Sequence, residues 1–135
     1  MSASGARLYF TDNLWGLIGP RTSDLRVAVR EGGAFRRAPE YDRWFARINT
    51  RAALEFAPAT SEDELELYFT RLTMHFPLRP QFEIMAASRA RADEAFGAPE
   101  RIEALRGYVE VPSVAPIFAP TYRLVVARPP PMRNP

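Results

Sequence analysis

Apolar residues recur at helical spacing between residues 39 and 49. Tyr41, Trp44, Phe45 and Ile48 stand at positions i, i+3, i+4 and i+7 and would form one apolar stripe on a helix. The segment begins with a proline, which suits a first helical turn, and it carries two acids close to its start, where negative charge stabilises a helix. The pattern therefore predicts a main helix over residues 39–49.

A second main helix is predicted over residues 61–76. Ser61 and Glu64 have the spacing of a capping box, in which each side chain accepts a hydrogen bond from a backbone N–H at the start of a helix. Apolar residues then recur every three or four positions, and Pro77 would end the helix. Part of the segment also alternates in the manner of a strand, but the acids at its start favour the helix.

Strands are predicted where apolar and polar residues alternate. They cover residues 7–10, 25–30, 50–57, 81–86, 108–111 and 122–127. Residues 50–57 are also compatible with an extension of the first helix, although a strand is favoured. Residues 11–13 are expected to form a turn, and Gly32 and Gly33 to close a hairpin, because glycine adopts positive φ without steric cost.

Short or irregular elements are predicted for several of the other segments. Residues 14–20 are apolar but interrupted by glycines and a proline, which predicts a buried loop or a docking segment. Short helices are predicted over residues 88–96 and from Pro99 onward. Residues 129–135 begin with three consecutive prolines and are expected to form an extended tail.

These elements predict a single α+β domain over residues 1–128. It would hold a mixed or antiparallel sheet of about four to six strands, the two main helices (39–49 and 61–76) and one or two short helices. The chain has no run of about 18 apolar residues, and its first ten residues do not resemble a secretory leader. A soluble, cytoplasmic or virion-associated protein without a membrane span is therefore expected.

Charge is unevenly distributed along the chain. All 18 basic residues are arginine, which reflects codon bias in a GC-rich genome or a need for planar guanidinium groups that bind carboxylates and phosphates. Residues 1–51 carry nine arginines and five acids (+4), residues 52–100 carry four and nine (−5), and residues 101–135 carry five and two (+3). The basic ends would pair with the acidic middle inside one fold, or form a surface that orients a partner.

Few side chains suit catalysis. The chain has no cysteine, which excludes thiol nucleophiles, Fe–S clusters and cysteine-based zinc sites. His75 would lie near the end of the second helix, where a structural or surface role is favoured over catalysis. The acids near residue 62 lack a calcium-loop pattern, and no nucleophile elbow or phosphate loop occurs. No metal and no cofactor are expected, and an enzyme is the less favoured class.

Arginine and aromatic residues instead favour interaction with a partner, because these types are enriched at binding hot spots. The candidate partner-binding residues are Trp15, Arg36, Arg37, Arg43, Arg47 and Arg51. The favoured function is that of a non-enzymatic structural or interaction protein. Such a protein would be an accessory subunit of a larger assembly, such as a phage particle or a multi-subunit complex, with a protein partner or a second copy of the chain.

Two alternative functions remain open from the sequence. Arg43, Arg47 and Arg51 stand at i, i+4 and i+8 and would line one helix face, which suits contact with the phosphates of a nucleic acid. A small cofactor-independent enzyme would use tyrosine, arginine and carboxylate groups for proton transfer.

Overall fold

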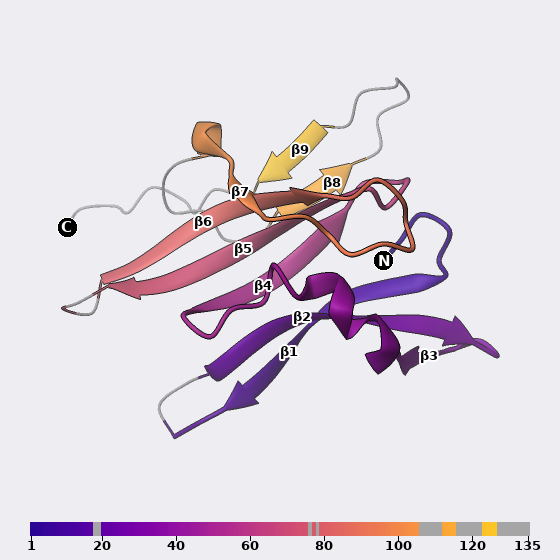
Figure 1. Ribbon diagram of the computed structural model, residues 1–135, viewed down its shortest axis with the longest axis horizontal. Coiled ribbons are helices and arrows are strands. Elements are labelled where there is room, and N and C mark those ends of the chain that lie inside the picture. Colours follow the sequence, from indigo (N-terminus) through magenta and orange to yellow (C-terminus); the bar gives the residue numbers. More distant parts are fainter. Residues whose placement is uncertain (18–19, 76, 78, 106–111, 116–122, 127–135) are drawn as a thin grey trace, which may run out of the picture.

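The computed structural model describes residues 1–17, 20–75, 77, 79–105, 112–115 and 123–126, with the backbone alone for Trp15 and for the last two segments. Within these residues the chain is mostly β-strand (Figure 1). The first sheet is antiparallel and has the order β1-β2-β3. Its strands are β1 (Arg7–Trp15), β2 (Pro20–Glu31) and β3 (Ala34–Arg37).

The second sheet is also antiparallel and has the order β4-β5-β6-β7. Its strands are β4 (Ala53–Thr60), β5 (Glu66–His75), β6 (Arg79–Ser88) and β7 (Glu100–Arg101). A separate hairpin consists of β8 (Pro112–Ala115) and β9 (Arg123–Val126). The described helices are two short 3-10 helices, η1 (Pro39–Phe45) and η2 (Glu103–Leu105).

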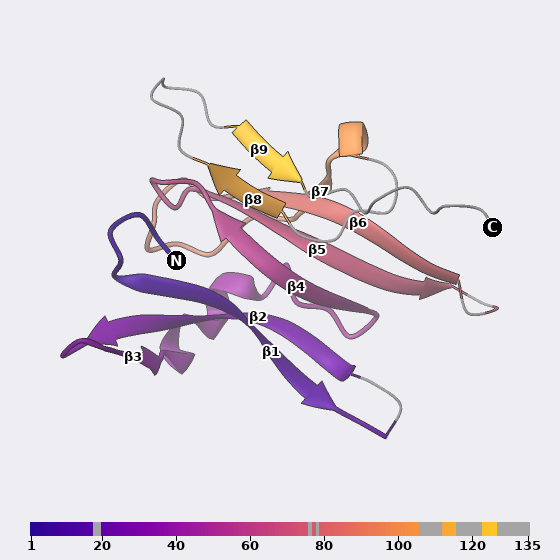
Figure 2. The same cartoon turned by 180° about the vertical axis from the view of Figure 1, so that it is seen from behind.

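The elements pack on two sides of the sheets. Figures 1 and 2 show η1 on one side, in contact with β2, and the β8–β9 hairpin on the opposite side of the second sheet, where β8 contacts β4 and β5. The second sheet is therefore covered on both faces over part of its area. A strand in such a position buries side chains of both orientations.

The hydrophobic core lies between η1 and the two sheets. Its buried members come from both sheets, from η1 and the turn after it, and from the connection between β6 and β7: Tyr9, Leu25, Val27, Trp44, Phe45, Ile48, Leu67, Phe69, Met85, Ala87 and Phe96. The ring of Phe45 lies 6.3 Å from that of Tyr9 and 6.0 Å from that of Phe96, distances at which aromatic pairs attract. The apolar stripe predicted within residues 39–49 does face the core.

The predicted α+β class with two main helices is wrong, and one reason lies in residues 39–49. η1 is a 3-10 helix that ends at Phe45, so only part of the predicted helix forms. The side chain of Asn49 accepts a hydrogen bond from the backbone N–H of Leu25 (2.8 Å) and donates one to the Leu25 carbonyl (3.0 Å). Because these two bonds hold Asn49 against β2, the chain leaves the direction of the helix.

The predicted helix over residues 61–76 is mostly strand. β5 occupies Glu66–His75, and Leu67, Phe69 and Thr70 are all buried. Leu67 and Phe69 belong to the core, whereas Thr70 has the opposite orientation, toward the face on which β8 lies. Because β5 also carries Tyr68 and Leu72 on the second face, its apolar residues fall at helical spacing as well.

Ser61 and Glu64 belong to a hairpin turn rather than to a capping box. Ser61 Oγ accepts a hydrogen bond from the N–H of Glu66 (2.9 Å), and the N–H of Ser61 donates to the Glu66 carbonyl (3.0 Å). Glu64 adopts a φ of 59°, in the left-handed region. The side-chain bonding that caps a helix also closes a turn, and here the turn joins β4 to β5.

The strand predictions agree more closely with the structure. The segments at residues 7–10, 25–30, 50–57, 81–86 and 122–127 overlap β1, β2, β4, β6 and β9. Gly32 and Gly33, with φ of 56° and 88°, close the β2–β3 hairpin as predicted. The turn predicted at residues 11–13 is wrong, because β1 continues through these positions.

The remaining predictions have mixed outcomes. Residues 88–96 form no helix, and the chain after Pro99 forms β7 and then the three-residue helix η2. The strand predicted at residues 108–111 and the tail at 129–135 lie outside the described residues.

The two sheets are joined along β4. Pro58 has no N–H for the β4–β5 ladder, Ala57 adopts a φ of 54°, and the strand register shifts at this point. The bulge leaves the N–H of Ala57 free to donate to Thr11 Oγ1 of β1 (3.2 Å). Ser23 Oγ of β2 donates to the carbonyl of Glu55 (2.8 Å), so both long strands of the first sheet bond to β4.

Glu55 is a fully buried carboxylate on β4. It accepts hydrogen bonds from Arg71 Nε (3.0 Å), from the hydroxyl of Thr50 (3.0 Å) and from the backbone N–H of Thr50 (3.2 Å). Burial raises the pKa of Glu55, although its partners Thr50 and Arg71 favour the charged form. The guanidinium of Arg71 also donates to the carbonyl of Ile48 (2.9 Å), which ties the turn after η1 to the second sheet.

Arg89 is a buried residue that bonds to several segments. Its guanidinium carbon lies 4.6 Å from the ring centre of Trp44 and 4.2 Å from that of Phe96. The guanidinium donates three hydrogen bonds of 2.8–3.1 Å, to the carbonyl of Glu64, the carbonyl of Glu94 and the hydroxyl of Tyr9. Arg89 thereby holds β1, η1, the β4–β5 turn and the connection after β6 together.

The Arg89→Met variant should lower the free energy of unfolding by about 3 kcal/mol, because it leaves three buried acceptors without their donor while keeping most of the apolar contact. Urea denaturation followed by fluorescence measures the change. Arg91→Met is the matched control, since the Arg91 side chain is 70% exposed and its loss should cost less than about 1 kcal/mol. Equal losses in the two variants would contradict a structural role for Arg89.

Candidate functional site

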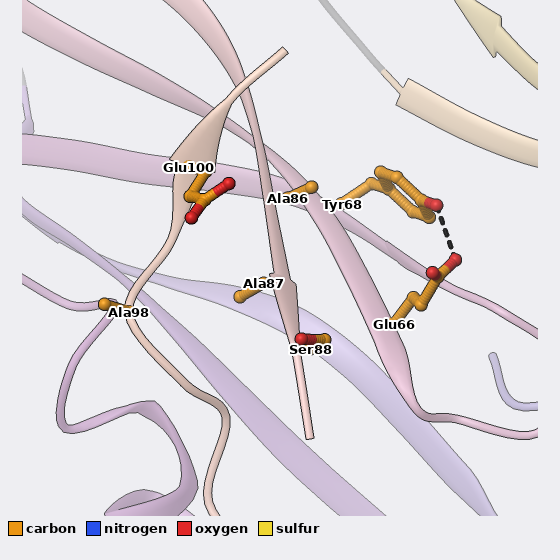
Figure 3. A pocket seen from close by; sticks show the side chains of 7 residues that line it. All are labelled: Glu66, Tyr68, Ala86, Ala87, Ser88, Ala98 and Glu100. Carbon is orange, nitrogen blue, oxygen red and sulfur yellow. Dashed lines mark hydrogen bonds between the residues drawn. The ribbon is translucent and has the colours of Figure 1, made fainter. Parts of the chain in front are cut away.

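An open hollow of about 260 Å³ lies over β5, β6 and β7. Figure 3 shows the side chains that line it, which are Glu66, Tyr68, Ala86, Ala87, Ser88, Ala98 and Glu100. Tyr68 pairs with Ala86 in the β5–β6 ladder, and Ala86 pairs with Glu100 in the β6–β7 ladder. The three residues therefore form one row, and the small side chain of Ala86 leaves the space between its two larger neighbours.

The polar side-chain groups of this hollow are the carboxylates of Glu66 and Glu100, the phenol of Tyr68 and the hydroxyl of Ser88 (Figure 3). Tyr68 donates a hydrogen bond of 2.6 Å to Oε2 of Glu66. The pKa of Tyr68 is raised to about 12, mainly by burial and to a smaller extent by this hydrogen bond and by the charge of Glu66. The phenol therefore keeps its proton at neutral pH and cannot act as a base there. The hollow offers acceptors for a hydrogen-bond donor, and none of the described arginines lines it.

The arginines proposed from the sequence as partner-binding residues fall into two groups, those with ion pairs and those without them among the described residues. Arg36 donates two hydrogen bonds to Glu31 (3.0 and 2.9 Å) and one to Glu40 (3.2 Å). Arg37 donates to Asp42 (3.2 Å). These partners lie within residues 1–51 rather than in the acidic middle of the chain, so the first segment neutralises part of its own charge.

Arg43, Arg47 and Arg51 are exposed and have no ion pair among the described residues. They do not line one helix face, because η1 ends at Phe45 and the chain changes direction before Arg51. Trp15 is the last residue of β1, and its side chain lies outside the described part of the chain.

A second candidate site is formed by exposed residues at one end of the molecule. The β1–β2 and β5–β6 hairpins point to this same end, as both views show (Figures 1 and 2). The connection into β4 also turns here, since Ala53 pairs with Thr73 near the end of β5. We use the name hairpin end for seven of the exposed residues in and beside these three turns, which are Leu14, Leu17, Arg21, Arg51, Met74, His75 and Arg79.

The apolar side chains of the hairpin end are unusually exposed. Leu17 is fully exposed, Leu14 is 60% exposed and Met74 is 54% exposed. They are three of the four large apolar side chains that the described part of the chain leaves exposed. Single exposed leucines are common on proteins, but three large exposed apolar side chains in hairpins that point to the same end indicate an interaction surface.

The charge of the hairpin end has one sign. The sequence contains no Asp or Glu in residues 13–23, 50–54 or 72–82. Arg21, Arg51 and Arg79 make no ion pair and no side-chain hydrogen bond within the described residues. The hairpin end is therefore a basic surface with apolar tips.

The nearest acids below the β1–β2 turn are already neutralised. Asp12 and Asp24 stand opposite each other in the ladder. Arg26 lies 2.8 Å from Asp24 and 3.8 Å from Asp12, and Arg37 also lies 3.8 Å from Asp12. These ion pairs leave the positive charge of the turns uncompensated.

Sequence reasoning recognised only part of this surface. Residues 14–20 were expected to form a buried loop or a docking segment, and Leu17 is fully exposed. His75 was expected near a helix end, whereas it ends β5 and pairs with Arg79 across the hairpin. The three acid-free runs are a signal present in the sequence, but only the tertiary structure shows that they lie at the same end of the molecule (Figures 1 and 2).

No group of three or more histidine, cysteine, aspartate or glutamate side chains in the described residues is placed to hold a metal ion. Across the same residues, no helix is long and apolar enough to span a bilayer. Comparison of the chain with protein-family models, with curated proteins and with solved structures finds no match.

The phenol of Tyr68 should titrate near pH 12, in agreement with its raised pKa of about 12. Because this pKa exceeds the ordinary value of 10.0, the neutral phenol stabilises the fold below pH 10 and that contribution is lost as the pH rises from 10 toward 12. The ultraviolet absorbance titration of the wild type minus that of Tyr68→Phe isolates this group.

In Glu66→Gln the pKa of Tyr68 should fall but remain above 10.0, because burial, the larger cause, is retained. A difference titration of the wild type centred near pH 10 would contradict the described environment of Tyr68.

Proposed function

We propose that the chain is a non-enzymatic interaction protein that attaches to a larger assembly through the hairpin end. The observation that carries this proposal is that two hairpins pointing to the same end of the fold (Figure 1) carry exposed Leu14, Leu17 and Met74, together with arginines that have no ion pair among the described residues. Removing each of these apolar side chains from water would contribute about 1.5–3 kcal/mol at full burial. Binding of a partner to such a surface would therefore lower the free energy.

The arginines support the same proposal. Most described arginines of the two sheets are engaged in ion pairs, among them Arg26, Arg36, Arg71 and Arg101. Those of the hairpin end have no such partner within the described residues, so their guanidinium groups are available to a second molecule. Arginine is enriched at interfaces because it combines planar hydrogen bonding with apolar contact.

The acidic hollow over β5–β7 gives little support to an enzymatic function. Its phenol is protonated at neutral pH, and its carboxylates Glu66 and Glu100 stand on either side of the Ala86 strand (Figure 3). Proton transfer needs a group whose pKa lies near the working pH. The interaction proposal therefore rests on the hairpin end and not on this hollow.

The proposal predicts that the full chain sediments with large material in an extract of its native source. The Leu14→Ser/Leu17→Ser/Met74→Ser variant should remain in the supernatant after ultracentrifugation, because it loses the apolar contact. Immunoblotting of pellet and supernatant measures the distribution.

The control for this experiment is Arg43→Gln/Arg47→Gln, which removes two exposed arginines that lie outside the hairpin end. This variant should sediment like the wild type. Wild-type protein that stays entirely in the supernatant as a single chain would overturn the proposal, and so would a control variant that loses sedimentation as fully as the apolar one.

A further inference from the structure

We infer that the surface met by the hairpin end is an anionic lipid bilayer. The inference rests on the proposed function, since it names the partner of the same surface. It is drawn from three features of the described residues: the position of the apolar side chains at turn tips, the sign of the surrounding charge, and the arrangement of both at the ends of rigid strands.

The apolar side chains lie at the tips of the molecule rather than on a flat face. Leu14 and Leu17 belong to the β1–β2 turn region and Met74 to the β5–β6 turn region, at the same end of the two sheets (Figures 1 and 2). Peripheral proteins bury apolar side chains about 5–10 Å into the boundary between headgroups and acyl chains. Side chains that project from two hairpins can enter this boundary together without a preformed pocket.

The charge around these tips complements anionic headgroups. Arg21 follows the first turn, Arg79 follows the second, and Arg51 precedes the strand that pairs with β5. Each arginine near an anionic membrane surface strengthens binding by about fivefold. The absence of acids from the sequence of all three turns removes the repulsion that a carboxylate would introduce.

The strands behind the turns are held in place by the core. β1 and β2 bond to β4 through Thr11 and Ser23, and β5 contributes Leu67 and Phe69 to the core. The tips are thus presented by strands whose bases are rigid. Membrane entry by such tips requires no reorganisation of the sheets, and so the ordering cost of binding is small.

A lipid surface fits these features better than other partners do. A nucleic acid would use the arginines but leave Leu14, Leu17 and Met74 in water. A protein hot spot is one contiguous patch whose surrounding contacts exclude water, whereas the apolar side chains here belong to two separate hairpins. A bilayer accepts both the arginines and the isolated apolar tips.

Sedimentation with purified vesicles tests the inference. The full chain should bind vesicles of phosphatidylglycerol and phosphatidylcholine and bind those of phosphatidylcholine alone at least about tenfold more weakly. The Arg21→Gln/Arg51→Gln/Arg79→Gln variant should lose about a hundredfold in affinity for the anionic vesicles. Raising the ionic strength should weaken wild-type binding, a measurement that does not depend on the folding of any variant.

The apolar contribution is tested with Leu14→Ser/Leu17→Ser/Met74→Ser, which should lose at least about tenfold in affinity. Arg43→Gln/Arg47→Gln is again the matched control and should change affinity by less than about twofold, because those arginines lie outside the contact. Circular dichroism and urea denaturation show whether each variant is folded before its binding is compared.

Several results would overturn the lipid inference. They are a wild type that does not bind anionic vesicles, equal binding to neutral and anionic vesicles, and a control variant as weak as the triple arginine variant. If the wild type does not bind vesicles but still sediments in the native extract, and that sedimentation is lost in the Leu14→Ser/Leu17→Ser/Met74→Ser variant, the partner is a protein or a nucleic acid. The proposed function then stands. If both experiments fail, the proposed function falls as well.

Discussion

The guanidinium of Arg89 lies between Trp44 and Phe96 and donates hydrogen bonds to Glu64, Glu94 and Tyr9. Its acceptors belong to the β4–β5 turn, to the irregular connection that also holds Phe96, and to the edge strand β1. A buried cation is costly unless its donors are satisfied, and here backbone carbonyls and a phenol satisfy it. The position of η1 over the core depends on this arrangement.

The second sheet shows how a small protein can use both faces of its strands. One face of β5 and β6 contributes Leu67, Phe69 and Met85 to the core under η1. The other face carries Thr70 and Ile84, which are also buried, on the side where the β8–β9 hairpin lies. Burial on both faces stabilises the sheet, and it also weakens the apolar–polar alternation from which strands are normally recognised in a sequence.

The hairpin end follows from the way in which two antiparallel sheets pack. In each sheet alternate turns lie at the same end of the strands, and the hydrogen bonds of β1 and β2 to β4 align the two sheets. Arg21, Arg51 and Arg79 are separated by about thirty residues each along the chain, yet this arrangement brings them to the same end. The apolar and basic character of that end is therefore a property of the fold and not of any one segment.

Several features are determined by local sequence and could be predicted from it. The glycine pair Gly32–Gly33 closes a hairpin because glycine accepts positive φ, and the apolar stripe from Trp44 to Ile48 is buried as its spacing predicts. Four of the predicted strands overlap strands of the two main sheets, because alternating side chains suit a half-covered sheet. The lack of cysteine also set the limits of the available chemistry.

Tertiary structure decided the rest. The helix within residues 39–49 is shortened because Asn49 bonds to the backbone of Leu25, a residue far away in the chain. Ser61 and Glu64 form a turn because β4 and β5 pair, although the same two residues also match a capping box. The hairpin end could not be predicted from the sequence for a related reason. The composition shows that its three turns are free of acids, but only the packing of the two sheets along β4 places Leu17, Met74 and the arginines at one end.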